Sequence, residues 1–193
     1  MKERLAMPDD EISGFVSGLR DTMSAVANIP VPTIAAIEGV AFGGGLELAL
    51  ACDMRVAGSD AQLGLTETAL AIIPGAGGSQ RLPRLIGVAK AKELIFTATR
   101  LSSQEALALG LINHSVPSGQ AATKAEAIAA SIVDKGPIAI RMAKEAIDSG
   151  ASLEISRGLQ VEKACYDELV MTLDRKEGLN AFVEKRKPKY KGC

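Results

Sequence analysis

The order of apolar and polar positions predicts mixed strands and helices in the first part of the chain and helices alone towards the C-terminus. A β-branched apolar run predicts a buried strand over Thr33–Ile37. Before it, apolar residues at helical spacing predict a helix within Lys2–Ala27, and the two prolines of Asn28–Pro32 predict a connector. Further strands are expected at Met54–Ala57, Gln62–Leu65 and Leu111–Val116.

Helix start and stop residues divide the rest of the chain. Ser102 and Glu105 form a capping-box pattern at the start of one helix, and Gly110 ends it. Beyond the last strand, proline at a helix start and glycine just past a helix end mark successive helices. The other helices expected are Leu46–Cys52, Ala89–Thr97, Gln120–Lys135, Pro137–Ser149 and Ser152 to about Thr172. This change predicts an α/β core over residues 1–117 and a helical region over 118–193.

One glutamate lies in unusually apolar surroundings. The helix predicted over Leu46–Cys52 is apolar on almost every side, which is typical of a helix inside a protein. Glu47 lies in its first turn. Because a buried carboxylate without partners is costly, Glu47 is expected to reach a cavity unless it breaks a strong rule of burial.

Two glycine-rich turns precede predicted helices. Gly43, Gly44 and Gly45 come just before the helix of Glu47, whose first N–H groups have no partner within the helix. Such groups suit an anion or a developing negative charge, so the pattern fits a catalytic carboxylate beside an oxyanion site. A tight strand-to-helix turn, with Glu47 attracted to the helix dipole, explains it equally well. The second loop, Pro74–Ser79, lacks the Lys-Ser/Thr pair of a phosphate-binding loop.

Composition and charge narrow the classes of function. Hydrophobic residues make up 47% of the 193 residues, which supports a folded core. The net charge of −1 and the aromatic content of 3% argue against a nucleic-acid partner. No segment has the unbroken apolar length of a membrane span, and the first residues do not resemble a targeting peptide.

Cysteine and histidine contribute no candidate site. Cys52, Cys165 and Cys193 are odd in number and widely spaced, so neither a disulfide framework nor a zinc site is expected. The single histidine, His114, excludes a site with several histidine ligands and receives no catalytic role. We therefore expect a reducing compartment and no metal.

Three stretches resemble the crotonase superfamily, closest to its enoyl-CoA hydratases. They read GVAFGGGLELALACDMRVAG, LGLTETALAIIPGAGGSQRLPRLIG and AKELIFTATRLSSQEALALGLIN, and the likeness extends to the closing FVEKRKPKYKG. Within the superfamily the chain looks most like the branch of methylglutaconyl-CoA hydratase and the enoyl-CoA hydratase domain-containing proteins. The resemblance implies an α/β fold, with a partial crotonase ββα spiral followed by a C-terminal all-helical region.

The resemblance also implies roles for individual residues. Glu47 and Glu67 match the two catalytic glutamates, and the backbone N–H of Gly44 matches an oxyanion-hole donor. The residues that match substrate or coenzyme A contacts are Lys2, Gly43, Gly75 and Lys189. A pair of glutamates favours a hydratase over the isomerases and thioesterases of the superfamily, while the assignment of acid and base stays open.

The family pattern further implies a substrate and an assembly. The reaction expected is addition of water to a 2-enoyl-CoA thioester in fatty-acid β-oxidation or branched-chain amino-acid breakdown. No cofactor is expected to be bound permanently, since coenzyme A is part of the substrate. The C-terminal helices are expected to form a homotrimer or hexamer. The expected compartment is the mitochondrial matrix in a eukaryote and the cytoplasm in a bacterium.

One departure from the family pattern concerns the start of the chain. In the family another oxyanion donor lies in a Gly-Ala-Asp segment before the lysine that matches Lys2, whereas this sequence begins at Met1. We therefore expect a shortened chain that is a weak catalyst, because one such donor can contribute about 10²–10³ in rate. Two alternatives stay open: a non-catalytic partner in a crotonase-fold assembly, and an RNA-binding hydratase homologue, which the low aromatic content disfavours.

Overall fold

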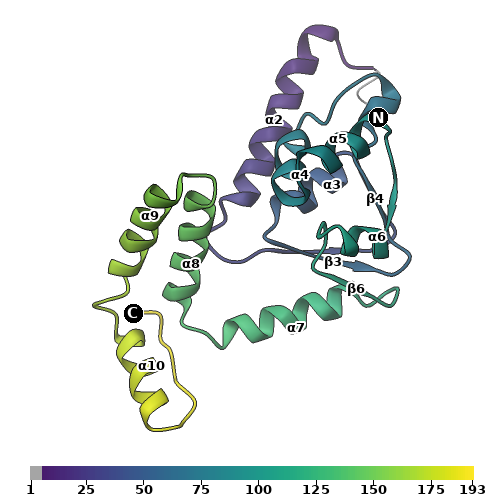
Figure 1. Ribbon diagram of the computed structural model, residues 1–193. Helices are drawn as coiled ribbons and strands as arrows, with labels where there is room; N and C mark the ends of the chain where they lie inside the picture. The colour runs from purple at the N-terminus through teal and green to yellow at the C-terminus, as the bar shows by residue number, and fades with distance from the viewer. Residues whose placement is uncertain (1–5) are drawn as a thin grey trace. The chain divides into compact units, whose positions relative to one another are not determined.

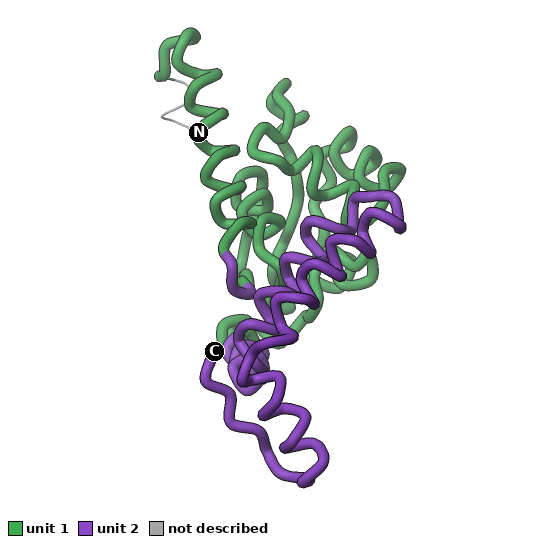
Figure 2. Tube along the Cα trace, turned by 90° about the vertical axis from the view of Figure 1, so that its left-hand side faces the viewer, with its two compact units in different colours: residues 1–29, 33–125 green, residues 30–32, 126–193 purple. Residues whose placement is uncertain are grey.

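The computed structural model describes residues 6–193, and the chain divides into two compact units (Figure 2). Unit 1 comprises residues 1–29 and 33–125, and unit 2 comprises residues 30–32 and 126–193. The division falls inside the helix α7 (Ala121–Val133), so the first turn of this helix belongs to unit 1. The boundary predicted near Pro117 lies before that helix.

Two small sheets form the β part of unit 1. In the first, three parallel strands follow the order β1-β3-β6, and Ala36 lies opposite Val56. In the second, β2 and β4 are parallel, and β4 and β5 are antiparallel. The strands are β1 (Ile34–Ile37), β2 (Val40–Phe42), β3 (Met54–Gly58), β4 (Gln62–Gly64), β5 (Leu101–Ser102) and β6 (His114–Val116).

The chain passes from the first sheet to the second at Glu38 and Gly39. Gly39 has a φ of 66°, a left-handed conformation that glycine adopts without strain. The Glu38 carboxylate accepts hydrogen bonds from the N–H groups of Gly119, at 3.1 Å, and Ala121, at 2.8 Å. Ala121 begins α7, so one side chain ties the end of β1 to the start of that helix.

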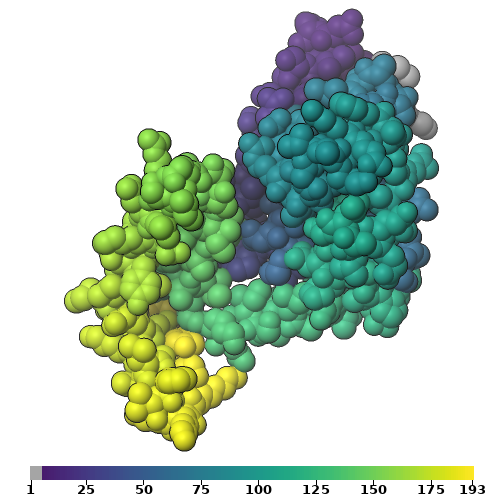
Figure 3. Space-filling model, viewed as in Figure 1, coloured from purple at the N-terminus to yellow at the C-terminus, as the bar shows by residue number. Residues whose placement is uncertain are grey.

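The helices of unit 1 cover the core around a short central helix, α3. In Figure 1, α3 packs against α2 and α4, and α4 packs against α5. Side chains of α4, α5 and α6, coloured teal in Figure 3, form the near surface of this unit. The helices are α2 (Asp9–Ala27), α3 (Gly44–Ala51), α4 (Gly78–Ile86), α5 (Val88–Phe96) and α6 (Ser103–Ala108). The core includes Leu46, Leu50, Leu63, Leu65, Leu82, Leu94 and Leu111.

The helix α3 is less enclosed than its apolar sequence predicts. Leu46, Ala49 and Leu50 are buried, but Leu48 is 44% exposed.

The capping box predicted at the start of α6 is confirmed. The Ser102 side chain accepts a hydrogen bond from the backbone N–H of Glu105, and the Glu105 carboxylate accepts one from the backbone N–H of Ser102.

A buried arginine closes the C-terminal end of α3. The Arg55 Nε donates to the carbonyl of Leu111 at 2.8 Å, and its Nη1 donates to Cys52 at 2.7 Å and to Ala49 at 3.3 Å. Burial lowers the pKa of Arg55 from its usual value, which the nearby Cys52 and Asp53 partly oppose. Because helix-end carbonyls lack partners within the helix, this side chain fixes the end of α3 that lies opposite Glu47.

Unit 2 is helical. Its helices α8 (Pro137–Gly150) and α9 (Ile155–Asp167) pack against each other, and α10 (Leu173–Val183) follows. The two backbones approach closely at Gly150 and Gly158, because a Cβ placed on Gly158 would lie 3.2 Å from the carbonyl oxygen of Gly150. These helices confirm the all-helical region expected from the sequence.

Candidate active site

Glu47 lies in the first turn of α3, buried with 3% of its surface exposed. Its Oε1 accepts two hydrogen bonds, from the backbone N–H groups of Ala76 and Gly78, each at 2.8 Å. Gly78 is the first residue of α4, so the carboxylate also meets the positive end of that helix. Hydrogen bonds to a charged acceptor are stronger than neutral ones, and they offset the loss of hydration on burial.

Glycine at position 78 makes this contact possible. A Cβ there would lie 2.9 Å from Leu65 Cδ1 and 3.0 Å from both Cγ and Oε1 of Glu47. Leu65 is itself buried, with 2% of its surface exposed. The second glycine-rich loop therefore approaches the glutamate through its main chain, and a side chain at position 78 would displace Leu65 or Glu47.

Glu67 is buried at the start of the short 3₁₀ helix η1 (Glu67–Leu70). Its carboxylate lies against Gly43, where a Cβ would be 3.1 Å from Oε1 of Glu67. Gly43 has a φ of 54° and precedes α3 directly, so its left-handed backbone also favours glycine. The next side chain fixes η1, because Thr68 Oγ1 donates to the carbonyl of Ile95 at 2.5 Å.

Both glutamates thus lie at the N-terminal end of α3, Glu47 in the first turn of that helix and Glu67 on η1, with its carboxylate against Gly43. The first hydrogen bond within α3 joins the N–H of Glu47 to the carbonyl of Gly43 at 2.9 Å. The N–H of Gly44 precedes that bond and has no acceptor inside the helix, and Gly44 is exposed. Two carboxylates beside exposed helix-start donors can exchange protons next to a group that stabilises negative charge.

Two further predicted site residues belong to the N-terminal part of the chain. Gly75 is half-buried against α2, and a Cβ there would lie 2.8 Å from Val16 Cγ1. Its carbonyl accepts a hydrogen bond from Arg20 Nε at 3.2 Å. Lys2 lies outside the described residues.

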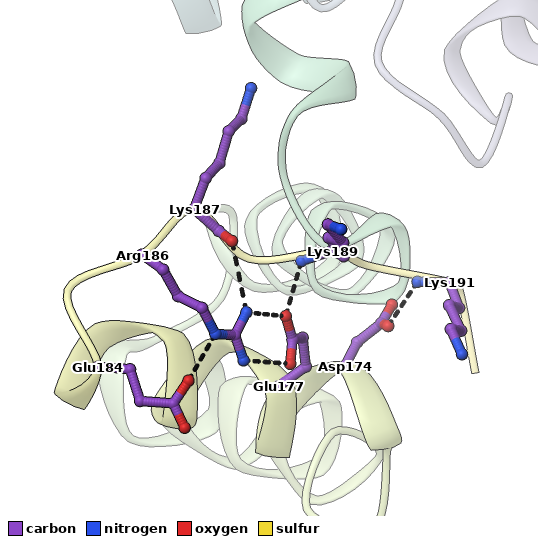
Figure 4. Close-up of polar contacts among 7 residues, drawn as sticks. All are labelled: Asp174, Glu177, Glu184, Arg186, Lys187, Lys189 and Lys191. Atoms are coloured by element: carbon purple, nitrogen blue, oxygen red, sulfur yellow. Dashed lines mark hydrogen bonds and ion pairs between the residues drawn. The ribbon is translucent and has the colours of Figure 1, made fainter.

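Lys189 belongs to unit 2 and has an exposed side chain. Its backbone N–H donates to Glu177 Oε1 at 2.8 Å, and Arg186 forms two bonds to the same carboxylate at 2.6 and 2.9 Å (Figure 4). These bonds, that from Arg186 first, lower the pKa of Glu177 to about 2. Asp174 is buried and accepts from the N–H of Lys191 at 2.7 Å. The basic tail is therefore folded onto α10.

Sequence reasoning did not identify the partners of Glu47. Ala76 and Gly78 act through backbone N–H groups, which every residue except proline carries. The one available signal was the position of the second glycine-rich loop at the start of a helix, where free N–H groups are expected.

Within residues 6–193 no group of three or more His, Cys, Asp or Glu is placed to hold a metal ion. Nor does that part of the chain contain a helix long and apolar enough to span a membrane.

Known proteins resemble this chain throughout its length. The family model described as enoyl-CoA hydratase/isomerase matches residues 2–193. The mitochondrial methylglutaconyl-CoA hydratase of Rattus norvegicus is 55% identical over 196 residues, which cover 100% of this chain and 62% of that protein. The putative enoyl-CoA hydratase/isomerase YngF of Bacillus subtilis is 50% identical over 100% of this chain and 74% of its own length.

A solved structure shows the same fold. The enoyl-CoA hydratase from Bacillus anthracis has a TM-score of 0.97 and 55% sequence identity, and the match covers 100% of this chain and 75% of that one. The chain spans 62% of the length of the rat hydratase and 58% of the human one. Its fold and its sequence therefore both agree with these relatives. The chain belongs to the enoyl-CoA hydratase/isomerase family.

Proposed function

We propose that this chain carries the acid–base site of an enoyl-CoA hydratase, which adds water across the double bond of a 2-enoyl-CoA thioester. The observation that carries this proposal is the buried Glu47 in the first turn of α3, held by the backbone N–H groups of Ala76 and Gly78. The Glu67 carboxylate lies against Gly43, which precedes the same helix. Relatives named hydratases support this reaction over others of the family.

Hydration moves two protons in opposite directions. One glutamate, as a carboxylate, takes a proton from water while the water oxygen bonds to the β-carbon. The electron pair of the double bond shifts towards the thioester, whose oxygen gains negative charge that the N–H of Gly44 can stabilise. The other glutamate, as an acid, gives its proton to the α-carbon. The sum is addition of one water, and proton exchange with solvent restores the starting states of the two glutamates.

The bonds to Glu47 favour one of its oxygens for proton exchange. Backbone N–H groups only donate, so Oε1 is occupied as an acceptor by Ala76 and Gly78. A proton carried by Glu47 would therefore reside on Oε2. The same two bonds fix the carboxylate, so that Oε2 keeps one direction during the reaction.

The finer features of the proposal follow the family resemblance. We propose an acyl-CoA substrate from fatty-acid or branched-chain amino-acid breakdown. The proposed compartment is the mitochondrial matrix if the protein is eukaryotic and the cytoplasm if it is bacterial. A homotrimer or hexamer is supported by the strongly exposed apolar side chains of unit 2, which include Val133, Ile155, Met171 and Phe182. Light scattering should give a multiple of three protomers, and a monomer at micromolar concentration would contradict this assembly.

The hydratase proposal is tested with the full chain and a short 2-enoyl-CoA, by following loss of the conjugated thioester absorbance. Glu47→Gln and Glu67→Gln should each lower kcat by about 10²–10⁴-fold relative to the parent chain. Glutamine at 47 can still accept both N–H bonds through its amide oxygen, so the circular dichroism spectrum should not change.

The matched control is Glu93→Gln on α5, whose exposed carboxylate pairs with Lys90. This variant should keep the parent kcat. The parent chain is expected to be a weak hydratase, and a complete absence of hydration activity would refute the proposal. Activity of either glutamine variant within a few-fold of the parent would remove that glutamate from the mechanism.

A further inference from the structure

We propose that Arg20 and Arg81 are positioning residues for Glu47. Each donates to a carbonyl of the second glycine-rich loop, and that loop supplies the N–H groups that hold Glu47 Oε1. The inference rests on the proposed function, because it assigns the arginines a role in the acid–base step.

Arg20 acts on the peptide group that donates to the glutamate. Its Nε, from α2, bonds to the carbonyl of Gly75 at 3.2 Å. This carbonyl and the N–H of Ala76 belong to the same peptide unit, and the N–H donates to Glu47 Oε1 at 2.8 Å. Hydrogen bonds in such a chain polarise one another, so a cation on the carbonyl strengthens the N–H as a donor.

The packing of α2 holds the loop at the same place. One turn before Arg20, the side chain of Val16 lies close to Gly75, and a Cβ there would be 2.8 Å from Val16 Cγ1. Ala76 is buried in a small core with Met23 of α2 and Ala51 of α3. The loop is therefore fixed between the helix that carries Arg20 and the helix that carries Glu47.

Arg81 fixes the next peptide group. Its Nη1 donates to the carbonyl of Ala76 at 3.2 Å, and its guanidinium covers Gly77, where a Cβ would lie 2.0 Å from Nη1. Gly77 has a φ of 110°, and its carbonyl accepts the N–H of Arg81 at 2.8 Å. The side chain thus folds back over the start of its own helix and sets the orientation of the segment that ends at the Gly78 donor.

The loop needs such contacts because its own sequence is permissive. Gly75, Gly77 and Gly78 have no side chains that would restrict the backbone, so many conformations compete with the one that presents both donors. Two arginines on consecutive carbonyls select that conformation, and Glu47 Oε1 is bound from the opposite side of the loop.

The test compares Arg20→Met and Arg81→Met in the full chain. Each should lower kcat for hydration of a short 2-enoyl-CoA by about 10- to 100-fold, since small misplacements of a reacting group have effects of this size. KM should change far less, because neither arginine is assigned to the thioester. Arg20→Lys, which keeps the cation, should recover part of the lost kcat.

Arg84→Met is the matched control on α4. Among residues 6–193 its guanidinium bonds to the carbonyl and the side chain of Gln80, one turn earlier, so kcat should equal that of the parent chain. A second measurement does not depend on activity: the amide-proton NMR resonances of Ala76 and Gly78 should shift upfield in the Arg20 and Arg81 variants, as weaker hydrogen bonds require, and stay in place in Arg84→Met.

The outcomes separate the inference from the proposed function. If both methionine variants keep the parent kcat and amide shifts, or if Arg20→Lys recovers no more than Arg20→Met, the positioning role is wrong. If Glu47→Gln keeps the parent kcat, the hydratase assignment fails instead, and the amide shifts still decide whether the arginines order the loop.

Discussion

Replacing Gly78 by alanine tests how tightly the second glycine-rich loop packs on Glu47. The change keeps the backbone N–H and adds only a Cβ, which would lie 2.9 Å from Leu65 Cδ1 and 3.0 Å from Glu47 Oε1. Both neighbours are buried, and Glu47 is held in place by two hydrogen bonds. One of them must move, because ordinary contacts of a Cβ begin at about 3.4 Å.

The magnitude follows from two opposing effects. Overpacking of a buried site destabilises by about 1–3 kcal/mol. Restricting the unfolded chain by a glycine-to-alanine change stabilises by about 0.4–1 kcal/mol. The free energy of unfolding should therefore fall by about 1.3 kcal/mol, and at most by about 2.6 kcal/mol. The central value corresponds to a Tm lower by about 3–5 °C for a chain of this length. Displacement of Glu47 should also lower kcat by about 10- to 100-fold.

The assay is thermal unfolding followed by circular dichroism, in one buffer, with Gly45→Ala as the control. Gly45 lies in the first turn of α3, and a Cβ there meets nothing within 4 Å. That variant should melt at or slightly above the parent Tm. A Gly78→Ala chain that melts as high as Gly45→Ala would refute the close packing, and with it the reason for glycine at position 78.

Two further predictions concern charged groups. Arg55→Met should lower the free energy of unfolding by about 2–4 kcal/mol, because it removes the donor to the buried carbonyl of Leu111 and to that of Cys52 at the end of α3. Urea unfolding measures this loss, and a change below 1 kcal/mol would contradict this role. The pKa of Glu177 is lowered to about 2, so its contribution to the attachment of the tail is complete above its usual value of 4.5 and is lost as the pH falls towards 2. The amide resonance of Lys189 should titrate in that window, because its N–H donates to Glu177. Arg186→Met should move the midpoint of this titration to higher pH. A midpoint that does not move would show that Arg186 does not lower the pKa of Glu177.

Local patterns determined much of the secondary structure. The β-branched run predicted β1, and the Ser102–Glu105 pair predicted the capping box of α6. The short strands β2 and β5 were missed, since runs of three and two residues show no periodicity. Strand partners also lay beyond the sequence, because the pairing of β1 with β3 and then β6 depends on contacts between distant segments.

The candidate site, too, could be predicted from the sequence only in part. An apolar helix with a glutamate in its first turn, preceded by three glycines, was enough to single out Glu47, and the family resemblance added Glu67. The sequence also predicted a helix apolar on nearly every side, yet Leu48 is 44% exposed, because burial depends on which neighbours reach each face.

Only the tertiary structure decided how Glu47 is held. Its partners lie 29 and 31 residues away and use backbone N–H groups, which carry no information about residue type. Arg20 and Arg81 likewise bind backbone carbonyls, which every residue carries and which the sequence therefore cannot single out. The residues able to do chemistry could be found from their types and order, whereas the geometry that directs them depends on main-chain groups brought together by folding.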